Sequence, residues 1–199
     1  MRRIEVCGGI ASGKTTLANL LKSDFCSAIL EEYERNPFLS EFYSSPADFA
    51  FETEITFLLQ HYHQIKRASG ANWFACDYSL FLDLAYSNAT LKSSERAVFL
   101  SVLDHILGEI GSPQILVFLV CSAEAELERI RSRGRAVEKG VNLDYLKRLN
   151  ASVEDTVRSL PSSTNLIEIN SGDLNFANDE NVRSEVRKML SDCMLHSEK

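Results

Sequence analysis

The residues with the clearest chemical potential form a glycine-rich segment near the N-terminus. It matches the pattern G-x-x-x-x-G-K-[ST] and consists of Gly8, Gly9, Ile10, Ala11, Ser12, Gly13, Lys14, Thr15 and Thr16. Glycines let backbone N–H groups turn toward phosphate oxygens, and a helix that follows adds the positive end of its dipole. We expect Lys14 to contact the β- and γ-phosphates and the Thr15 hydroxyl to bind Mg²⁺. The segment therefore predicts a site for a nucleoside triphosphate with Mg²⁺.

The class of reaction depends on residues outside this segment. A glycine-rich turn between a strand and a helix also arises by chance, and the same loop serves kinases, GTPases, ATPases and nucleotide-binding proteins without activity. A GTPase would carry an Asp-x-x-Gly strand end and an Asn-Lys-x-Asp guanine clamp, and neither string occurs in the sequence. The downstream residues favour a kinase instead.

Three further segments coincide with one family in order, spacing and chemistry. They are residues 31–38 (EEYERNPF), 57–60 (FLLQ) and 133–138 (RGRAVE). Together with the glycine-rich segment, they make the chain resemble the deoxynucleoside kinase family, and most of all its bacterial deoxyadenosine/deoxyguanosine kinase-like members, from residue 4 to about residue 160. The resemblance implies a salvage enzyme that uses ATP and Mg²⁺ to phosphorylate the 5′-hydroxyl of a deoxynucleoside, preferably a purine. It also implies a homodimer, formed through helices such as those near residues 48–68 and 94–108.

Glu31 matches the catalytic carboxylate of this family, because it follows the second expected strand and precedes an Asn-Pro pair by five residues. It would accept the proton of the 5′-hydroxyl, and a side chain at the carboxyl end of a strand projects into the cleft where such ligands bind. The resemblance further implies that Glu138 holds the sugar 3′-hydroxyl, with Tyr43 as its partner. From the local sequence alone, an acidic loop in which Glu31, Glu32 and Glu34 face water is an equal alternative.

Base recognition depends on the helical pattern at residues 48–68, which places Gln60 and Arg67 opposite an apolar stripe. Periodicity alone predicts that this polar side faces water. The resemblance implies instead that Gln60 makes paired amide hydrogen bonds to the base and that Arg67 pairs with Asp83. Such a set would read a base edge with both donor and acceptor groups. The alternative is that Asp83 is an ordinary exposed helix residue.

An arginine cluster stands out in this acidic chain, at Arg129, Arg131, Arg133 and Arg135. Two of its members, Arg129 and Arg133, share one face of a helix because they are four residues apart. The resemblance implies a lid at about residues 129–140, in which Arg129 and Arg133 stabilise the transferring charge and Arg133 and Arg135 bind the triphosphate. A solvated basic helix face is the alternative.

The chain departs from the family pattern after the third expected strand. The family has an acidic residue followed by arginine there, whereas this chain has Asp77-Tyr78-Ser79. Asp77 keeps the acidic role near Mg²⁺, but the position of the arginine that would contact phosphate and the 5′-hydroxyl region holds a tyrosine. Either Arg35 or Arg129 takes its place, or the chain belongs to a branch with altered chemistry.

Length and composition set the size class and exclude several partners. A chain of 199 residues with 45% hydrophobic residues suffices for one well-packed kinase domain, which we expect to span residues 1–199. The net charge of −7 and the pI near 5.2 argue against nucleic acid or an anionic membrane surface as a partner. Five cysteines suit free thiols in a reducing compartment, and no apolar run approaches the ~18 residues of a membrane span. We therefore expect a cytoplasmic protein.

Short apolar runs alternate with helical patterns, which is typical of a parallel sheet covered by helices on both faces. We expect strands at residues 3–7, 28–30, 73–76, 115–120 and 166–169. We expect helices near residues 14–23, 48–68, 78–88, 94–108, 123–133, 143–160 and 179–192. The sequence thus predicts an α/β, three-layer P-loop NTPase-type fold with a five-stranded parallel sheet and a short arginine-rich lid.

Two other functions fit parts of the pattern. A nucleoside monophosphate kinase of thymidylate type shares the loop and a basic lid, but it would need additional cations near the acceptor phosphate. A regulatory protein could use the same cleft to bind a nucleotide without turnover. Glu31 favours the enzyme, because a sensor needs no base beside the acceptor site.

Overall fold

A five-stranded parallel sheet forms the centre of the protein, as seen in a computed structural model that describes residues 2–23, 25–68 and 71–197. The strands are β1 (Arg2–Gly8), β2 (Cys26–Ile29), β3 (Trp73–Cys76), β4 (Ile115–Val120) and β5 (Leu166–Asn170). Their order in the sheet is β2-β3-β1-β4-β5, and every neighbouring pair is parallel. This arrangement confirms the predicted sheet and brings the carboxyl ends of β1, β2 and β3 to one edge.

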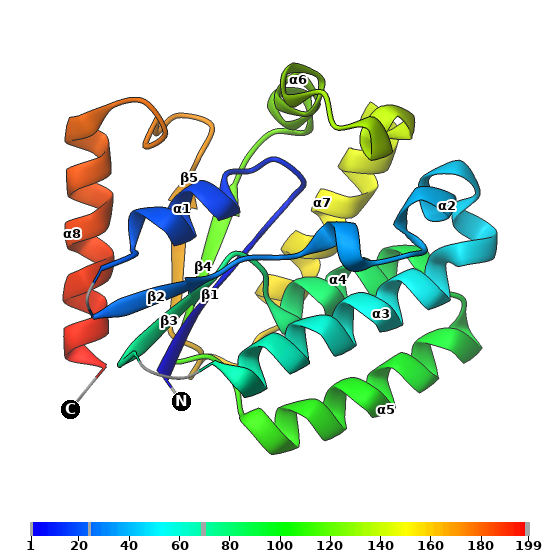
Figure 1. Cartoon of the computed structure of the whole chain (residues 1–199), viewed down its shortest axis with the longest axis horizontal. Helices are drawn as coiled ribbons and strands as arrows, with labels where there is room; N and C mark the ends of the chain where they lie inside the picture. The colour runs from blue at the N-terminus through cyan, green and yellow to red at the C-terminus, as the bar shows by residue number, and fades with distance from the viewer. Residues whose placement is uncertain (1, 24, 69–70, 198–199) are drawn as a thin grey trace.

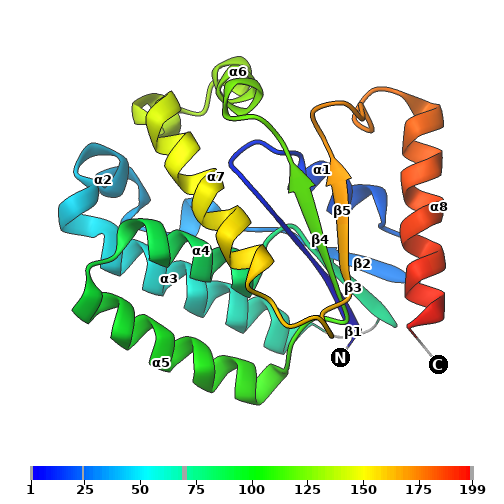
Figure 2. The same cartoon turned by 180° about the vertical axis from the view of Figure 1, so that it is seen from behind.

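Helices cover both faces of the sheet, so the predicted three layers are confirmed. The helices are α1 (Lys14–Leu20), α2 (Leu39–Ser44), α3 (Pro46–Arg67), α4 (Leu80–Thr90), α5 (Ser93–Ile110), α6 (Ala123–Arg133), α7 (Leu143–Arg158) and α8 (Glu180–His196), with 3-10 turns η1 (Tyr33–Arg35) and η2 (Ala136–Gly140). Figures 1 and 2 show α1 and α8 on one side of the sheet and α3, α4, α5 and α7 on the other. The residues predicted to read the base, Gln60, Arg67 and Asp83, come from α3 and α4 on the second side.

Alternation along β1 explains how one strand serves two cores. Ile4 and Val6 pack with Leu17 of α1 and Leu190 of α8, whereas Cys7 packs with residues of α4 and α7 on the opposite face. Successive side chains of a strand point to opposite faces, so this division follows from the sequence pattern. The strand is buried on both sides, as expected for the centre of a parallel sheet.

The first strand also fixes the start of α4 through a buried ion pair. Arg3 Nε donates to Glu5 Oε1 at 2.7 Å, and both side chains are almost fully buried. Glu5 Oε2 accepts hydrogen bonds from the Ser79 hydroxyl at 2.9 Å and the Leu80 N–H at 3.1 Å. The carboxylate therefore satisfies donors at the N-terminus of α4, the helix that carries Asp83.

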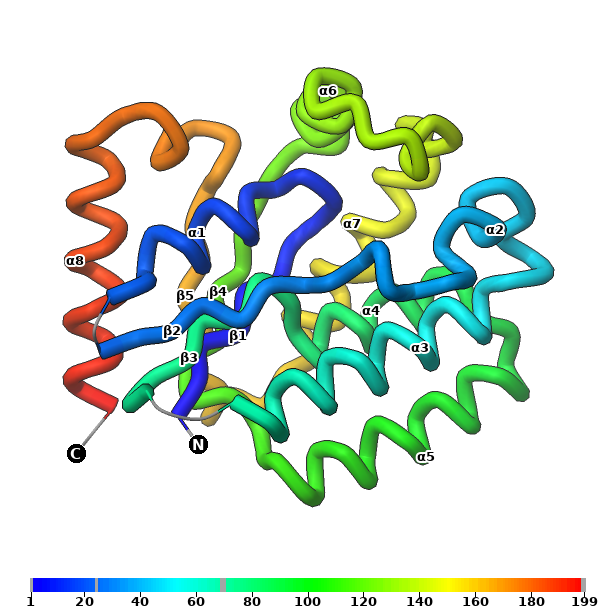
Figure 3. Tube along the Cα trace, in the orientation of Figure 1, coloured from blue at the N-terminus to red at the C-terminus, as the bar shows by residue number. Residues whose placement is uncertain are grey.

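Most boundaries of the predicted elements agree with the structure within two residues, but α1 ends three residues earlier and α8 ends four residues later than predicted. Asn142 accepts a hydrogen bond from the Tyr145 N–H and so caps α7, as the sequence indicates. By contrast α2 was missed, because six residues are too few to show a period and this helix is held by contacts of buried Leu39 and Phe42. Figure 3 shows the segment before it leaving β2 and running past α3, where Gln64 donates to the Leu30 carbonyl at 3.1 Å.

Two predictions about the whole chain can be compared with the structure directly. All five cysteines are free thiols, as predicted, and burial raises the pKa of Cys7 to about 12 and of Cys26 to about 11. These thiols are neutral at physiological pH and behave as small apolar side chains. Over the described ranges, no helix has both the length and the apolar character needed to cross a membrane.

Candidate active site

The glycine-rich segment forms the tight turn between β1 and α1. Gly8 and Gly13 have φ angles of 149° and 109°, which side chains rarely tolerate. A Cβ at Gly9 would meet the side-chain ends of Glu126 and Asn150, so glycine at this position lets the loop lie close to α6 and α7. Lys14 Nζ donates to the carbonyls of Gly8 and Gly9 at 3.0 and 2.7 Å, and burial lowers its pKa. The turn thus gathers backbone groups and an ammonium at the N-terminus of a helix, which is the geometry of an anion site.

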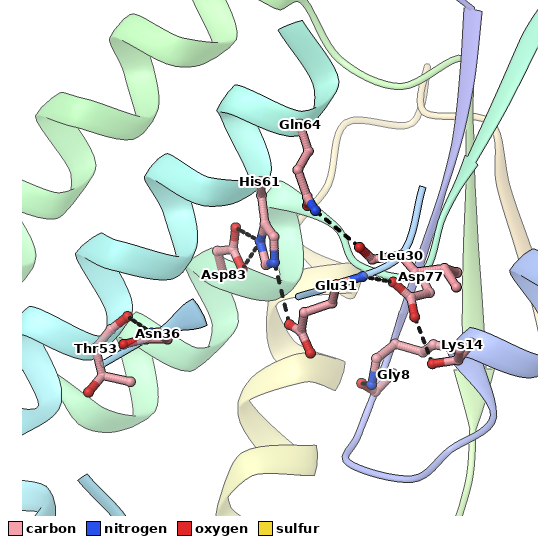
Figure 4. A network of polar contacts seen from close by, with 11 residues as sticks. Gly8, Lys14, Leu30, Glu31, Asn36, Thr53, His61, Gln64, Asp77 and Asp83 are labelled. Carbon is pink, nitrogen blue, oxygen red and sulfur yellow. Dashed lines mark hydrogen bonds and ion pairs between the residues drawn. The ribbon is translucent and has the colours of Figure 1, made fainter. Parts of the chain in front are cut away.

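Asp77 joins this loop to the segment that follows β2. Its Oδ2 accepts a hydrogen bond from the Thr15 hydroxyl at 2.6 Å. Its Oδ1 accepts one from the Glu31 N–H, also at 2.6 Å (Figure 4). Hydroxyl and carboxylate oxygens are the ligands that Mg²⁺ prefers, and Mg²⁺ in nucleotide enzymes takes only one or two of them from the protein. Thr15 and Asp77 therefore fit the predicted Mg²⁺ site.

A cavity of about 380 Å³ extends from the loop toward α3 and the arginine-rich segment. Of the residues predicted for the site, those that line it are Ile10, Ala11, Gly13, Lys14, Thr15, Thr16, Glu31, Tyr43, Asp77, Asp83, Arg129, Arg133, Arg135 and Glu138. Gly8, Gly9 and Ser12 form the turn behind it. The Ser12 hydroxyl is buried and, among the described residues, has no hydrogen-bond partner. The structure therefore brings together both ends of the predicted site, a phosphate loop and a set of carboxylates.

The predicted pairing of Arg67 with Asp83 is wrong. Arg67 is exposed in the last turn of α3, and neither it nor Gln60 lines the cavity. Asp83 is buried and lies against the ring of His61, with its two oxygens 2.9 and 3.1 Å from His61 Nδ1. Six residues of α-helix correspond to about 1.7 turns, so Arg67 lies about 120° around the helix axis from His61.

The face of α3 that lines the cavity carries Thr53, Glu54 and Phe57, and His61 follows one turn later. Glu54 and His61 are seven residues apart, the same spacing as Gln60 and Arg67. On the cavity face, two positions with that spacing therefore hold a carboxyl and an imidazole group. Sequence reasoning missed both residues, although polar groups at positions 54 and 61 on the same face as Phe57 were a signal that could have been used.

The imidazole of His61 occupies a central place in the site. It is buried and stacks on the Tyr78 ring, with centroids 3.9 Å apart and an angle of 7° between the ring planes. Its Nε2 lies 3.4 Å from Glu31 Oε1. Burial by itself would lower the pKa of His61, but Asp83 and Glu31 raise it to about 10, so the ring is an imidazolium at neutral pH.

The segment predicted as an arginine-rich lid spans the end of α6 and the turn η2, and internal ion pairs hold it. Arg133 forms a bidentate pair with the buried carboxylate of Glu138. Arg135 lies 3.6 Å from the same carboxylate and places its guanidinium 4.2 Å from the centre of the Tyr33 ring. Arg129 instead donates to the carbonyl of Ser171 at 2.8 Å.

Neither candidate for the missing arginine contacts Glu31. Arg35 has a side chain that is 72% exposed and pairs with Glu32 at 2.9 Å. Arg129 donates instead to the Ala11 carbonyl at 3.3 Å. Tyr78 itself is fully buried, and its ring covers the imidazole next to Glu31. The residue after Asp77 therefore contacts the His61 ring, whereas the resemblance implies an arginine that contacts phosphate and the 5′-hydroxyl region.

The chain was compared with protein families, with curated proteins and with solved structures. The family model described as "Deoxynucleoside kinase" matches residues 4–194. A deoxyguanosine kinase of Bacillus subtilis is 27% identical over 163 residues, which cover 79% of each chain. A deoxyadenosine kinase of Dictyostelium discoideum is 28% identical over 174 residues, covering 84% of this chain and 71% of that one. The structure of a deoxyadenosine kinase from M. mycoides with bound dCTP superposes with a TM-score of 0.78 at 17% identity, covering 98% and 99% of the two chains, which shows a shared fold.

Proposed function

The chain belongs to the deoxynucleoside kinase family, and we propose that it transfers the γ-phosphoryl group of ATP to the 5′-hydroxyl of a deoxynucleoside, with a purine deoxynucleoside preferred. One observation carries this proposal. The Glu31 carboxylate lines the same cavity as the phosphate loop and is tied to it through Asp77, which accepts from both Thr15 and the Glu31 backbone. A base beside an acceptor hydroxyl and a site for the donor phosphates are the two parts that phosphoryl transfer to an alcohol needs.

At the nucleotide end, Lys14 and the backbone of the loop would hold the β- and γ-phosphates. Thr15 and Asp77 would bind Mg²⁺, which supplies positive charge against the phosphate oxygens. The lid arginines, Arg133 and Arg135, would approach the phosphates from the side opposite the phosphate loop. Arg133 and Arg135 now share Glu138, so closure over ATP would exchange part of that ion pair for contacts with phosphate.

At the nucleoside end, three carboxyl groups would divide the work. Glu31 would take the proton of the 5′-hydroxyl, because its side chain is 36% exposed and opens into the cavity. Glu138 and Tyr43 would face the sugar 3′-hydroxyl. Glu54 would take the role of base reader that the resemblance gave to Gln60, next to Asp83, because both line the cavity and are buried. The names of the relatives, deoxyguanosine and deoxyadenosine kinases, support a purine substrate.

A panel of substrates tests this function. We expect ATP and Mg²⁺ to convert deoxyadenosine or deoxyguanosine to the monophosphate faster than deoxycytidine or thymidine, as followed by chromatography of the products. Thymidine monophosphate, added in the same panel, distinguishes the monophosphate kinase, which would form a diphosphate from it. Nucleotide binding without any product would indicate a regulatory protein.

We also propose that the chain forms a homodimer through α3 and α5. These helices pack together at one side of the molecule and expose large apolar side chains, Leu59 at 47% and Val98 at 51% (Figure 2). Light scattering should give twice the mass of the chain for the wild type. A Leu59→Glu/Val98→Glu variant should be monomeric, because burying two carboxylates in an apolar interface is unfavourable.

A further inference from the structure

The position that departs from the family pattern is structurally coupled to a residue on another helix. Tyr78 stands where the resemblance implies an arginine, and its ring lies parallel to the imidazole of His61 at a centroid distance of 3.9 Å. On α3 itself, Phe57 stacks on the same imidazole at 5.8 Å, with an angle of 28° between the planes. Aromatic contacts of this kind fix the plane of the ring and thus the direction of its nitrogens.

Each nitrogen of the imidazole points to a carboxylate. Nδ1 lies 2.9 Å from Asp83 Oδ2 on α4, and Nε2 lies 3.4 Å from Glu31 Oε1 after β2, as Figure 4 shows. The Nε2 atom is buried and, within the described part of the chain, has no hydrogen-bond partner of good geometry, so the Glu31 carboxylate at 3.4 Å is its ion-pair partner. Asp83, His61 and Glu31 therefore form a line that ends at the proposed catalytic base.

The charge of the ring follows from its neighbours. The charged groups that act on the ring and on its two carboxylates, besides Glu31 and Asp83 themselves, are Glu5, Lys14, Glu54, Asp77 and Arg135. Burial would lower the pKa of His61, but the charge and hydrogen bond of Asp83, followed by those of Glu31, raise it to about 10. The ring thus keeps both protons across neutral pH, and Nε2 can donate to Glu31.

The other cations near Glu31 are engaged elsewhere. Lys14 donates to carbonyls of the phosphate loop, Arg129 to the carbonyl of Ser171, and Arg135 lies over the Tyr33 ring beside Glu138. Of the basic side chains in the described ranges, His61 is the one found in an ion pair with Glu31.

We propose that His61 is a positioning residue that supplies, from α3, the positive charge that the family pattern places after Asp77. This inference rests on the proposed function. In that reaction the 5′-oxygen forms a bond to the γ-phosphorus, the bond from that phosphorus to the ADP oxygen breaks, and the hydroxyl proton passes to Glu31. His61 keeps its two protons throughout and holds the Glu31 carboxylate toward the hydroxyl, while Tyr78 and Asp83 hold His61.

The central variant is His61→Gln, which removes the charge but keeps a side chain that can hydrogen-bond to Asp83. We expect kcat to fall about 10–100-fold while KM for ATP stays within about twofold, because the orientation of the base is lost and the phosphate loop is untouched. His63→Gln is the matched control, since His63 is exposed on the same helix. It should match the wild type in both constants.

Rescue separates positioning from a merely structural role. Adding Tyr78→Arg to His61→Gln returns a cation from the position after Asp77, and we expect it to restore kcat at least about tenfold over His61→Gln alone. In a Glu31→Gln background, His61→Gln should cost less than about twofold, because its effect passes through Glu31. Full loss in that background would overturn the inference, because it would show that His61 acts independently of Glu31.

An NMR titration of the imidazole tests the ion pair between His61 and Glu31 without turnover. The measurement on the wild type does not require that a His61 variant folds. In the wild type the His61 ring should stay doubly protonated at pH 8, and Glu31→Gln should lower its pKa. A neutral ring at pH 7, or an active wild type with unchanged kcat in His61→Gln, would overturn the inference and leave the kinase assignment standing. A wild type that phosphorylates no nucleoside would overturn the proposed function itself, and with it the role of His61.

Discussion

Glu31 combines access to the cavity with a fixed direction. Burial by itself would raise its pKa, but the hydrogen bond and charge of His61, followed by Lys14 and Arg135, lower the pKa below its ordinary value. Its backbone N–H is held by Asp77, so the main chain is anchored where the side chain must point. A carboxylate that stays ionised at neutral pH is available to accept a proton during the reaction.

Replacement of Glu31 by Gln keeps the size and hydrogen bonding of the side chain but removes its ability to take a proton. We expect kcat to fall about 10²–10⁴-fold with a smaller change in nucleoside affinity, as measured by steady-state kinetics. Glu32→Gln is the control, because Glu32 pairs with Arg35 at the surface and should tolerate the change. An unchanged kcat in Glu31→Gln would assign the base to another carboxylate.

Glu54 is a buried acid whose neutral form the fold prefers. Burial raises its pKa to about 8, and although the Thr90 hydroxyl donates to Oε1 at 3.0 Å, the charges of Asp83 and Glu31 act in the same direction as burial. A protonated carboxyl offers one donor and one acceptor, as a carboxamide does. Glu54 can therefore present to a base edge the same pair of groups that the sequence led us to expect from Gln60.

This raised pKa makes stability depend on pH in a definite direction. The folded state binds the Glu54 proton more tightly than the unfolded state, so the contribution is complete below about pH 4.5 and is lost as the pH rises to about 8. Each pH unit in that window costs roughly 1.4 kcal/mol.

A Glu54→Gln variant should remove this dependence. We expect its Tm to exceed that of the wild type by a margin that grows between pH 5 and pH 8, as followed by thermal melts monitored by circular dichroism. Glu52→Gln, at an exposed position on the same helix, should melt in parallel with the wild type at every pH. Parallel curves for Glu54→Gln as well would show that Glu54 ionises normally in the folded protein.

Residues that belong to a local motif could be placed in the fold from the sequence, and the structure confirms their positions relative to the strands. Lys14 and Thr15 lie in a loop that the chain order alone defines, and Glu31 follows a strand end. The contacts of Asp83 could not be predicted in the same way, because they depend on which turn of α3 faces α4. That turn is determined by the packing of α3 against α4. We expected Asp83 to pair with Arg67, whereas its partner in the structure is His61, six residues earlier on α3.

Among the elements, the proposed lid gives a sharp test of nucleotide binding, because Arg133 and Arg135 form ion pairs with the Glu138 carboxylate. Arg133→Ala should lower kcat/KM for ATP about 10²–10³-fold, since a charge that meets the transferring phosphoryl group is lost. Nucleoside binding measured calorimetrically without ATP should change little, because Arg135 still lies 3.6 Å from Glu138. Arg131→Ala, at an exposed position two residues away on α6, is the control. Equal losses in ATP use and nucleoside binding would indicate that Arg133 mainly supports Glu138.

Elements with a strong pattern of their own were predictable, and those made by their neighbours were not. The apolar run at residues 115–120 predicted both ends of β4 correctly, and Asn142 correctly predicted the start of α7. The bounds of β2 were displaced, because only one of its four residues is fully buried and the apolar signal is weak there. The short helix α2 and the turn η2 depend on contacts between them, which a single chain segment does not reveal.

On the scale of the whole molecule, one buried ion pair, Arg3–Glu5, joins the sheet to two helices, α4 and α5. Besides Glu5, the Arg3 guanidinium donates to the carbonyls of Ile110 and Gly111 at the end of α5, at 3.0 and 2.6 Å. Glu5 holds the N-terminus of α4. The sequence showed a charged pair in a strand, but its role depends on which face of the sheet those helices cover.

Arg3→Leu should therefore destabilise the fold far more than an average substitution. It leaves Glu5 buried without its cation and two carbonyls without their donor, and we expect a loss of about 3–5 kcal/mol in the free energy of unfolding, measured by urea denaturation. Lys188→Leu, at an exposed position on α8, should change that free energy by less than about 0.5 kcal/mol. The double variant Arg3→Leu/Glu5→Leu should lose less than the sum of the two single variants, because neither charge is then left alone. Additive losses would mean that the two side chains stabilise the protein through separate contacts, and that the ion pair does not connect β1 to α4 and α5.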